Sequence, residues 1–411
     1  MLVLAIACVL SLAAWVYLVA GHGGFWLTSE RLPAASGADP VTWPAVAAVV
    51  PARNEAESLP VTLPALLAQD YPGEFRVYLV DDNSDDGTGE IAAELGEKAA
   101  RAGGAPLTVV RGRARPEGWA GKVWAMAQGL AEATRPGPEA TRPGAAVTAG
   151  RPDYVLFTDA DIASAPNALR DLVRGAAADD RAMVSQMALL RAQTRWERVV
   201  VPAFVYFFSQ LYPFRKVNDP RRGTAAAAGG CMLLSWPALR EAGGLEPVKG
   251  ALIDDVALGT LLKRNGNRTW LGLTTDIRST RPYPSLASLW HMIARSAYVQ
   301  LRYNPLLLAC TIAGLLLLYV APPAGAITAL IAAAAGSAGP ATALAGAAGL
   351  AGWALLTVSY LPMLRLYRLS PLRAPGLPLI AVLYAAMTAD SARRHYSGRA
   401  VSWRGRTAGR V

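Results

Sequence analysis

The sequence predicts an α/β fold in which helices flank a mainly parallel sheet, with transmembrane helices at both ends of the chain. Three observations support this prediction. The 411 residues are 53% hydrophobic and only 17% charged, whereas soluble domains are about 25% charged. The longest apolar runs lie near the two ends, and between them short β-rich runs alternate with helical patterns. This composition argues against a wholly soluble chain and excludes disorder throughout.

The first apolar run predicts a membrane anchor at residues 1–24. Residues 2–20 are nineteen consecutive uncharged residues, which is close to the roughly 20 residues that cross a bilayer as a helix. A cleaved signal peptide is the alternative, but no basic residue precedes the run. Arg31 and Arg53 follow it, so the positive-inside rule places the next domain in the cytoplasm.

The second apolar region predicts two or three further membrane segments. Residues 306–335 are uncharged and long enough for one span, which we expect to break at Pro322 and Pro323. Residues 341–364 form another span. The shorter run 377–388 is either a third span or a re-entrant or interfacial segment. We therefore expect a multi-pass protein of the cell (inner) membrane.

Between these regions the pattern predicts a sheet built from βαβ units. Short apolar runs alternate with helical stretches at a spacing typical of parallel strands. In such sheets a ligand lies at the carboxyl ends of the strands, so the residues after each strand are candidate binding residues. The predicted strands are 46–50, 75–80, 107–110 and 154–158, and the predicted helices are 58–69, 88–102 and 122–134.

The chain therefore divides into four predicted parts. They are the anchor (1–24), a cytoplasmic domain (45–304), a membrane region (305–392) and a basic tail (393–411). The three cysteines are widely separated, which excludes a disulfide framework. The net charge of +10 is spread over membrane-proximal loops and the tail. Such a distribution suits anionic lipid headgroups, so we expect no nucleic-acid partner.

Charged and polar residues follow three of the predicted strands. Residues 51–55 follow the first strand, 81–88 the second and 159–161 the fourth. Each cluster alone can be a turn or a helix cap, because Asp, Asn, Ser and Gly are common there. Together, Asp159 and Asp161 can direct two carboxylates toward one Mg²⁺ or Mn²⁺ ion. The second cluster can hydrogen-bond a nucleobase or ribose, so the pattern predicts a metal–nucleotide diphosphate site.

Five motifs occur in order along the chain. They are Pro51-Ala-Arg-Asn-Glu55, Val80-Asp-Asp-Asn-Ser84, Gly121-Lys122, Asp159-Ala-Asp161 and Asp254-Asp255. Over roughly residues 45–305 this order resembles the family 2 inverting glycosyltransferases. The segments 118–126 (GWAGKVWAM) and 253–259 (IDDVALG) are similar to the hopene-associated, or hopanoid biosynthesis-associated, subgroup. The resemblance implies a GT-A-type, Rossmann-like sheet that binds a nucleotide-sugar.

The resemblance implies that the loops after the first two strands bind the nucleoside. Asp81 and Asp82 match the family's aspartates that contact the uracil ring. The nucleoside pocket is lined by the loop that contains Pro51, Arg53 and Glu55. The implied donor is therefore a nucleotide-sugar, with a UDP-sugar as the expected class.

The resemblance also assigns residues to the diphosphate, the metal and the base. Lys122 matches a residue near the donor diphosphate or ribose. Asp161 matches the direct ligand of a divalent cation, with Asp159 as a second ligand or a ribose contact. Asp254 and Asp255 match the acidic pair near the acceptor, and Asp255 is the expected base that takes the acceptor's proton. The helical pattern that follows also suits carboxylates at a helix N-terminus.

One departure from the family concerns chain elongation. Members that build polysaccharides carry Gln-x-x-Arg-Trp, and the nearest counterpart here is residues 292–296 (MIARS). Arg295 keeps the position expected to contact the leaving diphosphate, but the glutamine and the tryptophan are missing. We therefore expect transfer of a single sugar to a membrane lipid, hopanoid-related, in place of processive synthesis.

The expected partners are a nucleotide-sugar donor, a membrane lipid acceptor and the bilayer, with a divalent cation as cofactor. Two alternatives stay open. A processive polysaccharide synthase would thread its product through the membrane segments. A non-catalytic membrane scaffold would keep the fold without the chemistry, although Asp161 and Asp255 are both present. The aromatic run 199–214 is either a core helix or an interfacial helix beside the acceptor.

Overall fold

The computed structural model describes residues 1–32, 39–136, 151–397, 402–403 and 406–407. Part of the predicted basic tail (398–401, 404–405 and 408–411) lies outside the described residues. The chain divides into two compact units. The helical unit comprises Met1–Ser29, Ala192–Arg215 and Tyr283–Arg399, and the sheet unit comprises Glu30–Arg191, Lys216–Pro282 and Ala400–Val411.

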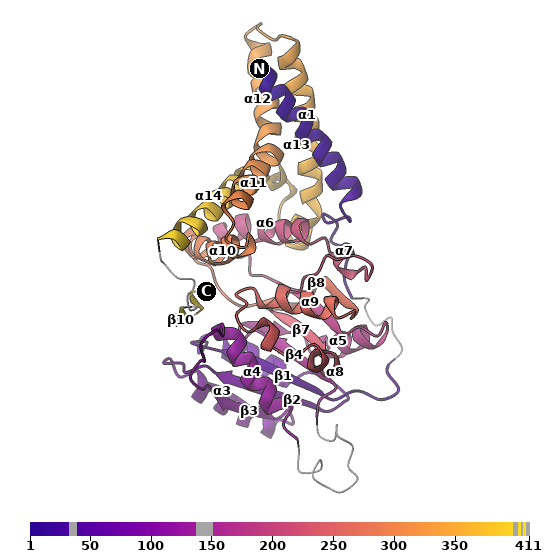
Figure 1. Ribbon diagram of the computed structural model, residues 1–411, viewed down its shortest axis with the longest axis vertical. Helices are drawn as coiled ribbons and strands as arrows, with labels where there is room; N and C mark the ends of the chain where they lie inside the picture. The colour runs from indigo at the N-terminus through magenta and orange to yellow at the C-terminus, as the bar shows by residue number, and fades with distance from the viewer. Residues whose placement is uncertain (33–38, 137–150, 398–401, 404–405, 408–411) are drawn as a thin grey trace. The chain divides into compact units, whose positions relative to one another are not determined.

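The sheet unit is built on a mixed sheet of eight strands in the order β3-β2-β1-β4-β7-β6-β8-β5 (Figure 1). Four neighbouring pairs are parallel and three are antiparallel. The predicted α/β fold is therefore confirmed, with antiparallel pairs beside the parallel ones. The strands are β1 (Val46–Ala52), β2 (Phe75–Asp81), β3 (Leu107–Arg111), β4 (Tyr154–Thr158), β5 (Ile162–Ser164), β6 (Met183–Leu189), β7 (Cys231–Ser235) and β8 (Thr269–Ser279).

The helices of this unit cover both faces of the sheet. They are α2 (Leu59–Leu67), α3 (Thr88–Arg101), α4 (Gly121–Ala133), α5 (Ala168–Ala177), α8 (Trp236–Glu241) and α9 (Asp254–Arg264), with a 3₁₀ turn at Glu246–Val248. Ala48 and Val50 of β1 pack in one hydrophobic cluster with residues of α2, α3 and α5. Ala47 and Val49 pack in another with residues of α4, α8 and α9. Because both faces of β1 are buried, its sequence is a continuous apolar run.

The helical unit holds four helical stretches that are long and apolar enough to cross a membrane, which suggests membrane association. These are Leu2–Gly21, Pro305–Ala334, Pro340–Leu366 and Pro371–Tyr396. In this unit α1 lies alongside α12 and α13 (Figure 1). The helices are α1 (Leu2–Gly21), α6 (Arg195–Leu211), α10 (Leu286–Gln300), α11 (Pro305–Leu315), α12 (Ala321–Ala334), α13 (Pro340–Leu366) and α14 (Leu377–Tyr396), with a 3₁₀ turn at Pro371–Gly376.

Three short elements complete the description. Helix α7 (Phe214–Asn218) contains the boundary between the two units. Strands β9 (Ser402–Trp403) and β10 (Arg406–Thr407) form an antiparallel pair.

The predicted break at Pro322 and Pro323 takes the form of a π-helical turn just before them, at Leu316–Val320. Because Pro322 has no N–H, it cannot donate to the carbonyl oxygen of Leu318, four residues earlier. The indole Nε1 of Trp15 donates to that oxygen instead, at 2.7 Å. Helix α1 thus pairs a backbone group that a bilayer would leave unpaired.

The aromatic run 199–214 lies mostly within α6, in the helical unit. A capping box begins this helix: the N–H of Glu197 donates to Oγ1 of Thr194, and the N–H of Thr194 donates back to the Glu197 carboxylate. Helix α6 packs against α10, α13 and α14. The interfacial location of this run stays a prediction.

Gly129 provides a test of the packing between α4 and the sheet. A Cβ at this position would lie 2.5 Å from Cγ1 of Val49 and 2.9 Å from Cγ2 of Val80. Gly129→Ala should lower the unfolding free energy by about 1–3 kcal/mol, because overpacking exceeds the gain in helix propensity of about 1 kcal/mol. Gly314→Ala is the control, since nothing lies within 4 Å of a Cβ there. Equal melting temperatures for the two variants in detergent would contradict the packing.

Candidate active site

The loops that follow β1 and β2 are bonded to each other at the carboxyl ends of these strands. Nη1 of Arg53 donates to the carbonyl oxygens of Asp82 at 2.5 Å and of Asn83 at 2.9 Å. The backbone N–H of Glu55 donates to Oγ1 of Thr88 at 2.9 Å. Two predicted nucleoside-binding residues, Arg53 and Glu55, are therefore held against the loop that carries the aspartate pair.

Asparagine side chains allow the tight turns in both loops. Asn54 and Asn83 have φ angles of 51° and 54°, in the left-handed region that asparagine tolerates better than most residues. Oδ1 of Asn54 also accepts the backbone N–H of Asp85 at 3.1 Å. The side chain of Asn54, in the turn after β1, therefore bonds the backbone of the turn after β2.

Asp81 and Asp82 are adjacent but differ in burial. Asp81 ends β2 and is half-buried, and its Oδ1 accepts the N–H of Ser84 at 3.0 Å. Asp82 is fully buried, and its N–H donates to the carbonyl oxygen of Ala52 at 2.8 Å. Neighbouring side chains on extended backbone point to opposite faces. Of the two predicted uracil contacts, Asp81 is therefore the accessible one.

Lys122, near the start of α4, joins carboxylates from two other elements. Its Nζ lies 2.8 Å from Oδ1 of Asp159, after β4, and 3.1 Å from Oδ2 of Asp254, at the start of α9. Burial acts to lower the pKa of Lys122, but the two carboxylates raise it above its ordinary value. Burial raises the pKa of Asp159, an effect that Lys122 opposes. The structure thus brings three predicted site residues into one network, with the lysine charged.

Asp255 lies beside this network. Its Oδ2 accepts the N–H of Gly229 and its Oδ1 accepts the N–H of Val256, each at 2.8 Å. Glycine suits position 229, because a Cβ there would lie 3.1 Å from Nζ of Lys122 and 3.3 Å from Oδ2 of Asp255. Burial, together with the carboxylate of Asp254, raises the pKa of Asp255 to about 6. A carboxylate with that pKa is suited to accept a proton near neutral pH.

Arg281 forms a second ion-pair network, which the sequence did not predict. Its Nε donates to Oδ2 of Asp161 at 2.6 Å, and its Nη2 donates to Oε1 of Glu55 at 2.8 Å. Burial acts to lower the pKa of Arg281, but the two carboxylates raise it. Arg281 lies two residues past β8. The sequence pattern predicts no strand at these residues, so it does not indicate Arg281 as a residue that follows one.

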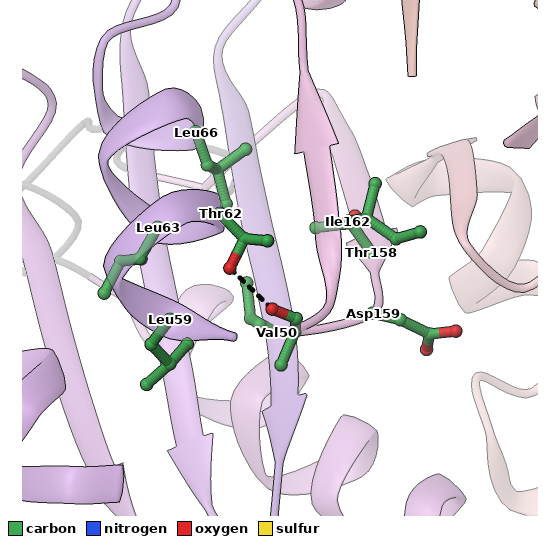
Figure 2. A pocket seen from close by; sticks show the side chains of 9 residues that line it. Val50, Leu59, Thr62, Leu63, Leu66, Thr158, Asp159 and Ile162 are labelled. Carbon is green, nitrogen blue, oxygen red and sulfur yellow. Dashed lines mark hydrogen bonds between the residues drawn. The ribbon is translucent and has the colours of Figure 1, made fainter. Parts of the chain in front are cut away.

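The turn between Asp159 and Asp161 is also held through its backbone. Oγ1 of Thr62, on α2, donates to the carbonyl oxygen of Ala160 at 2.6 Å (Figure 2). Thr280 donates to the carbonyl oxygen of Asp161 from its N–H at 2.8 Å and from its Oγ1 at 3.0 Å. In Figure 2 the Asp159 side chain points away from Thr62 and from the small apolar pocket beside α2. Its carboxylate instead contacts Nζ of Lys122 at 2.8 Å.

Asp159 and Asp161 fit a divalent cation as ligands. They offer hard oxygen donors on one short turn, and Mg²⁺ is usually bound through one or two carboxylates together with substrate phosphates. Among the described residues, no three His, Cys, Asp or Glu side chains are grouped so as to hold a metal ion by themselves. Two carboxylates would leave most of the coordination sites of such an ion to other oxygen atoms.

The remaining predicted residues lie in different parts of the chain. Pro51 is buried in β1 and lines a small recess with Lys122, Asp159 and Gly229. Arg295 is exposed on α10, in the helical unit. Its contact with the leaving diphosphate stays a prediction.

A family model and the solved structure of a mannosyltransferase agree with this fold. A family model described as "Glycosyltransferase like family 2" matches residues 44–298. The solved structure of the mannosyltransferase PcManGT from Pyrobaculum calidifontis, in complex with GDP-Man and Mn²⁺, is similar over 93% of this chain and 99% of that chain, with 21% sequence identity and a TM-score of 0.54. TarS from S. aureus is similar over 62% of this chain and 40% of its own, with 16% identity and a TM-score of 0.39. No curated protein matches the chain.

Thr62 allows a test of how the turn is held. Thr62→Val keeps the shape of the side chain but leaves the carbonyl oxygen of Ala160 without its donor, which should cost about 1–3 kcal/mol of unfolding free energy. Thr62→Ser keeps the hydroxyl and should retain most of that stability. Hydrogen exchange at the Ile162 amide, which donates to the carbonyl oxygen of Asp159 at 3.2 Å, should accelerate in the valine variant only. Equal stability and equal exchange in both variants would mean that this bond does not hold the turn.

Proposed function

The chain belongs to glycosyltransferase family 2, and we propose that it transfers a single sugar from a nucleotide-diphosphate sugar to a membrane lipid. The proposed donor is a UDP-sugar and the proposed acceptor is hopanoid-related. One observation carries the proposal: Asp159, Asp254 and Asp255 gather around Lys122 beyond the carboxyl end of β4. Acidic and basic groups at that edge of the sheet are suited to binding a nucleotide-sugar and to moving a proton.

In the proposed reaction, an acceptor hydroxyl attacks the anomeric carbon while the bond from that carbon to the diphosphate oxygen breaks. Asp255 takes the proton of the hydroxyl, and the N–H groups of Gly229 and Val256 orient its carboxylate. Lys122 stays positively charged, so it offsets charge that develops on the departing nucleotide diphosphate. A single displacement of this kind inverts the anomeric centre.

Asp161 and Asp159 would hold a divalent cation, Mg²⁺ or Mn²⁺. When bound, such an ion offsets the negative charge of the leaving diphosphate. The Mn²⁺ named with the mannosyltransferase supports this assignment. The nucleoside side of the site would be formed by Pro51, Arg53, Glu55, Asp81 and Asp82.

The proposed acceptor and location rest on the apolar helices. Four candidate spans support a multi-pass protein of the cell (inner) membrane. We propose that the catalytic domain (45–304) faces the cytoplasm between the anchor (1–24) and the membrane region (305–392), with the basic tail (393–411) near anionic headgroups. Residues 292–296 lack the glutamine and tryptophan of polysaccharide-building members, which favours transfer of one sugar.

The transfer is tested with the purified full chain in detergent, a UDP-sugar and a membrane lipid extract. We expect release of UDP and a lipid whose mass increases by one hexose or one hexosamine, measured by mass spectrometry. A long polymer as product would contradict single transfer. Asp161→Ala and chelation by EDTA should each slow transfer about a hundredfold or more. Asp276→Asn, at an exposed carboxylate of β8, is the matched control and should leave the rate unchanged.

Transfer should also depend on pH through Asp255. The base works only when deprotonated and its pKa is raised to about 6, so kcat/KM should fall about tenfold for each pH unit below that value. Asp255→Asn should lower kcat by about 10²–10⁴-fold. The same change should alter the melting temperature at neutral pH only slightly, because relief from a charge that burial disfavours offsets the loss of one of the two N–H bonds to the carboxylate. A flat pH profile in the acidic range would mean that another group takes the proton.

A further inference from the structure

Arg281 spans two carboxylates, one from the loop after β1 and one from the turn after β4. Its guanidinium bonds Asp161 at 2.6 Å and Glu55 at 2.8 Å. The side chains of Asp161 and Glu55 are only 9% and 7% exposed, so solvent screens these pairs weakly. Oγ of Ser279 also donates to Oδ2 of Asp161, at 3.2 Å. The oxygen atom Oδ2 of Asp161 is therefore already bonded twice.

These contacts have a consequence for the binding of a metal ion. A divalent cation at Asp161 would meet the positive charge of Arg281 at the same carboxylate. Like charges at one site repel each other. A carboxylate that is already paired with one cation therefore attracts a second cation less strongly. Arginine is a planar donor that also pairs well with phosphate oxygens. A diphosphate can therefore offer the guanidinium another anionic partner.

We propose that Arg281 is a positioning residue that occupies Asp161 until a nucleotide diphosphate arrives, so that the divalent cation binds with the donor and not before it. This inference rests on the proposed function, because it takes Asp161 as the ligand of the cation. Glu55 keeps one end of the guanidinium near the site while the other end leaves Asp161. The arrangement links cation binding to donor binding through one side chain.

The test measures Mn²⁺ affinity of the full chain in detergent without any nucleotide, by electron paramagnetic resonance. Arg281→Gln should bind Mn²⁺ on the order of tenfold more tightly than the unaltered chain, because Asp161 loses its competing cation. Arg278→Gln is the matched control: Arg278 is exposed, lies near the same strand end, and its Nε donates to the carbonyl oxygen of Thr275. That control should leave Mn²⁺ affinity unchanged. Equal or weaker binding by Arg281→Gln overturns the inference.

A second measurement keeps the test valid if Arg281→Gln is less stable. Mn²⁺ should raise the melting temperature of this variant more than that of the unaltered chain, since a ligand stabilises the state that binds it more tightly. Arg281→Lys should show a smaller effect than Arg281→Gln, because lysine keeps a positive charge beside Asp161 but cannot span both carboxylates as the fork does. An equal Mn²⁺-dependent rise in all three proteins overturns the inference.

Asp161→Asn separates failure of this inference from failure of the proposed function. With UDP present, the unaltered chain should bind Mn²⁺ and Asp161→Asn should lose that binding. If this holds but Arg281→Gln gains no affinity without nucleotide, only the inference fails. If Mn²⁺ binding is insensitive to Asp161→Asn, the proposed metal ligand is wrong and both proposals fail together.

Discussion

The ion pairs made by Lys122 and Arg281 are the interactions on which the rest of the site depends. Carboxylates this close repel one another and are costly to bury unless basic groups offset them. Two basic side chains here face five carboxylates, so the cluster keeps a negative charge. A further cation would favour the binding of an anionic diphosphate at such a cluster, which agrees with the proposed divalent ion. The five carboxylates are Glu55, Asp159, Asp161, Asp254 and Asp255.

Neutral groups determine where these charges lie. Thr62 and Thr280 hold the carbonyl oxygens of the turn after β4, and Gly229 lets the backbone approach Asp255. The flexible side chains of lysine and arginine could place their charged groups at several positions. These backbone contacts instead fix the position of the carboxylates with which they pair. The precision of the site therefore comes from α2, from the residues after β8 and from the loop before β7, in addition to the charged residues themselves.

The sequence predicted the features whose signal is local. Strand β1 was predictable because both its faces are buried, which leaves a continuous apolar run. Strand β6 was not, because it contains Ser185 and Gln186, which are buried polar residues that interrupt the pattern; Oγ of Ser185 bonds the carbonyl oxygen of Cys231 at 3.0 Å. Arg281 was not predictable either, since its partners lie 120 and 226 positions away. No periodicity in a single sequence reports contacts at that separation.

The same distinction applies to the helical unit, where hydropathy predicted the long apolar helices but not how they pair. A proline removes a hydrogen bond from its helix, and in a bilayer no water can replace it. Trp15 and Ser11 of α1 both donate to the carbonyl oxygen of Leu318, which Pro322 leaves unbonded within its own helix. An apolar helix of equal length without Trp15 and Ser11 would leave that oxygen unpaired. The packing position of α1 in the helical unit is therefore constrained by the hydrogen bonds of its polar side chains. Its hydropathy alone does not determine that position.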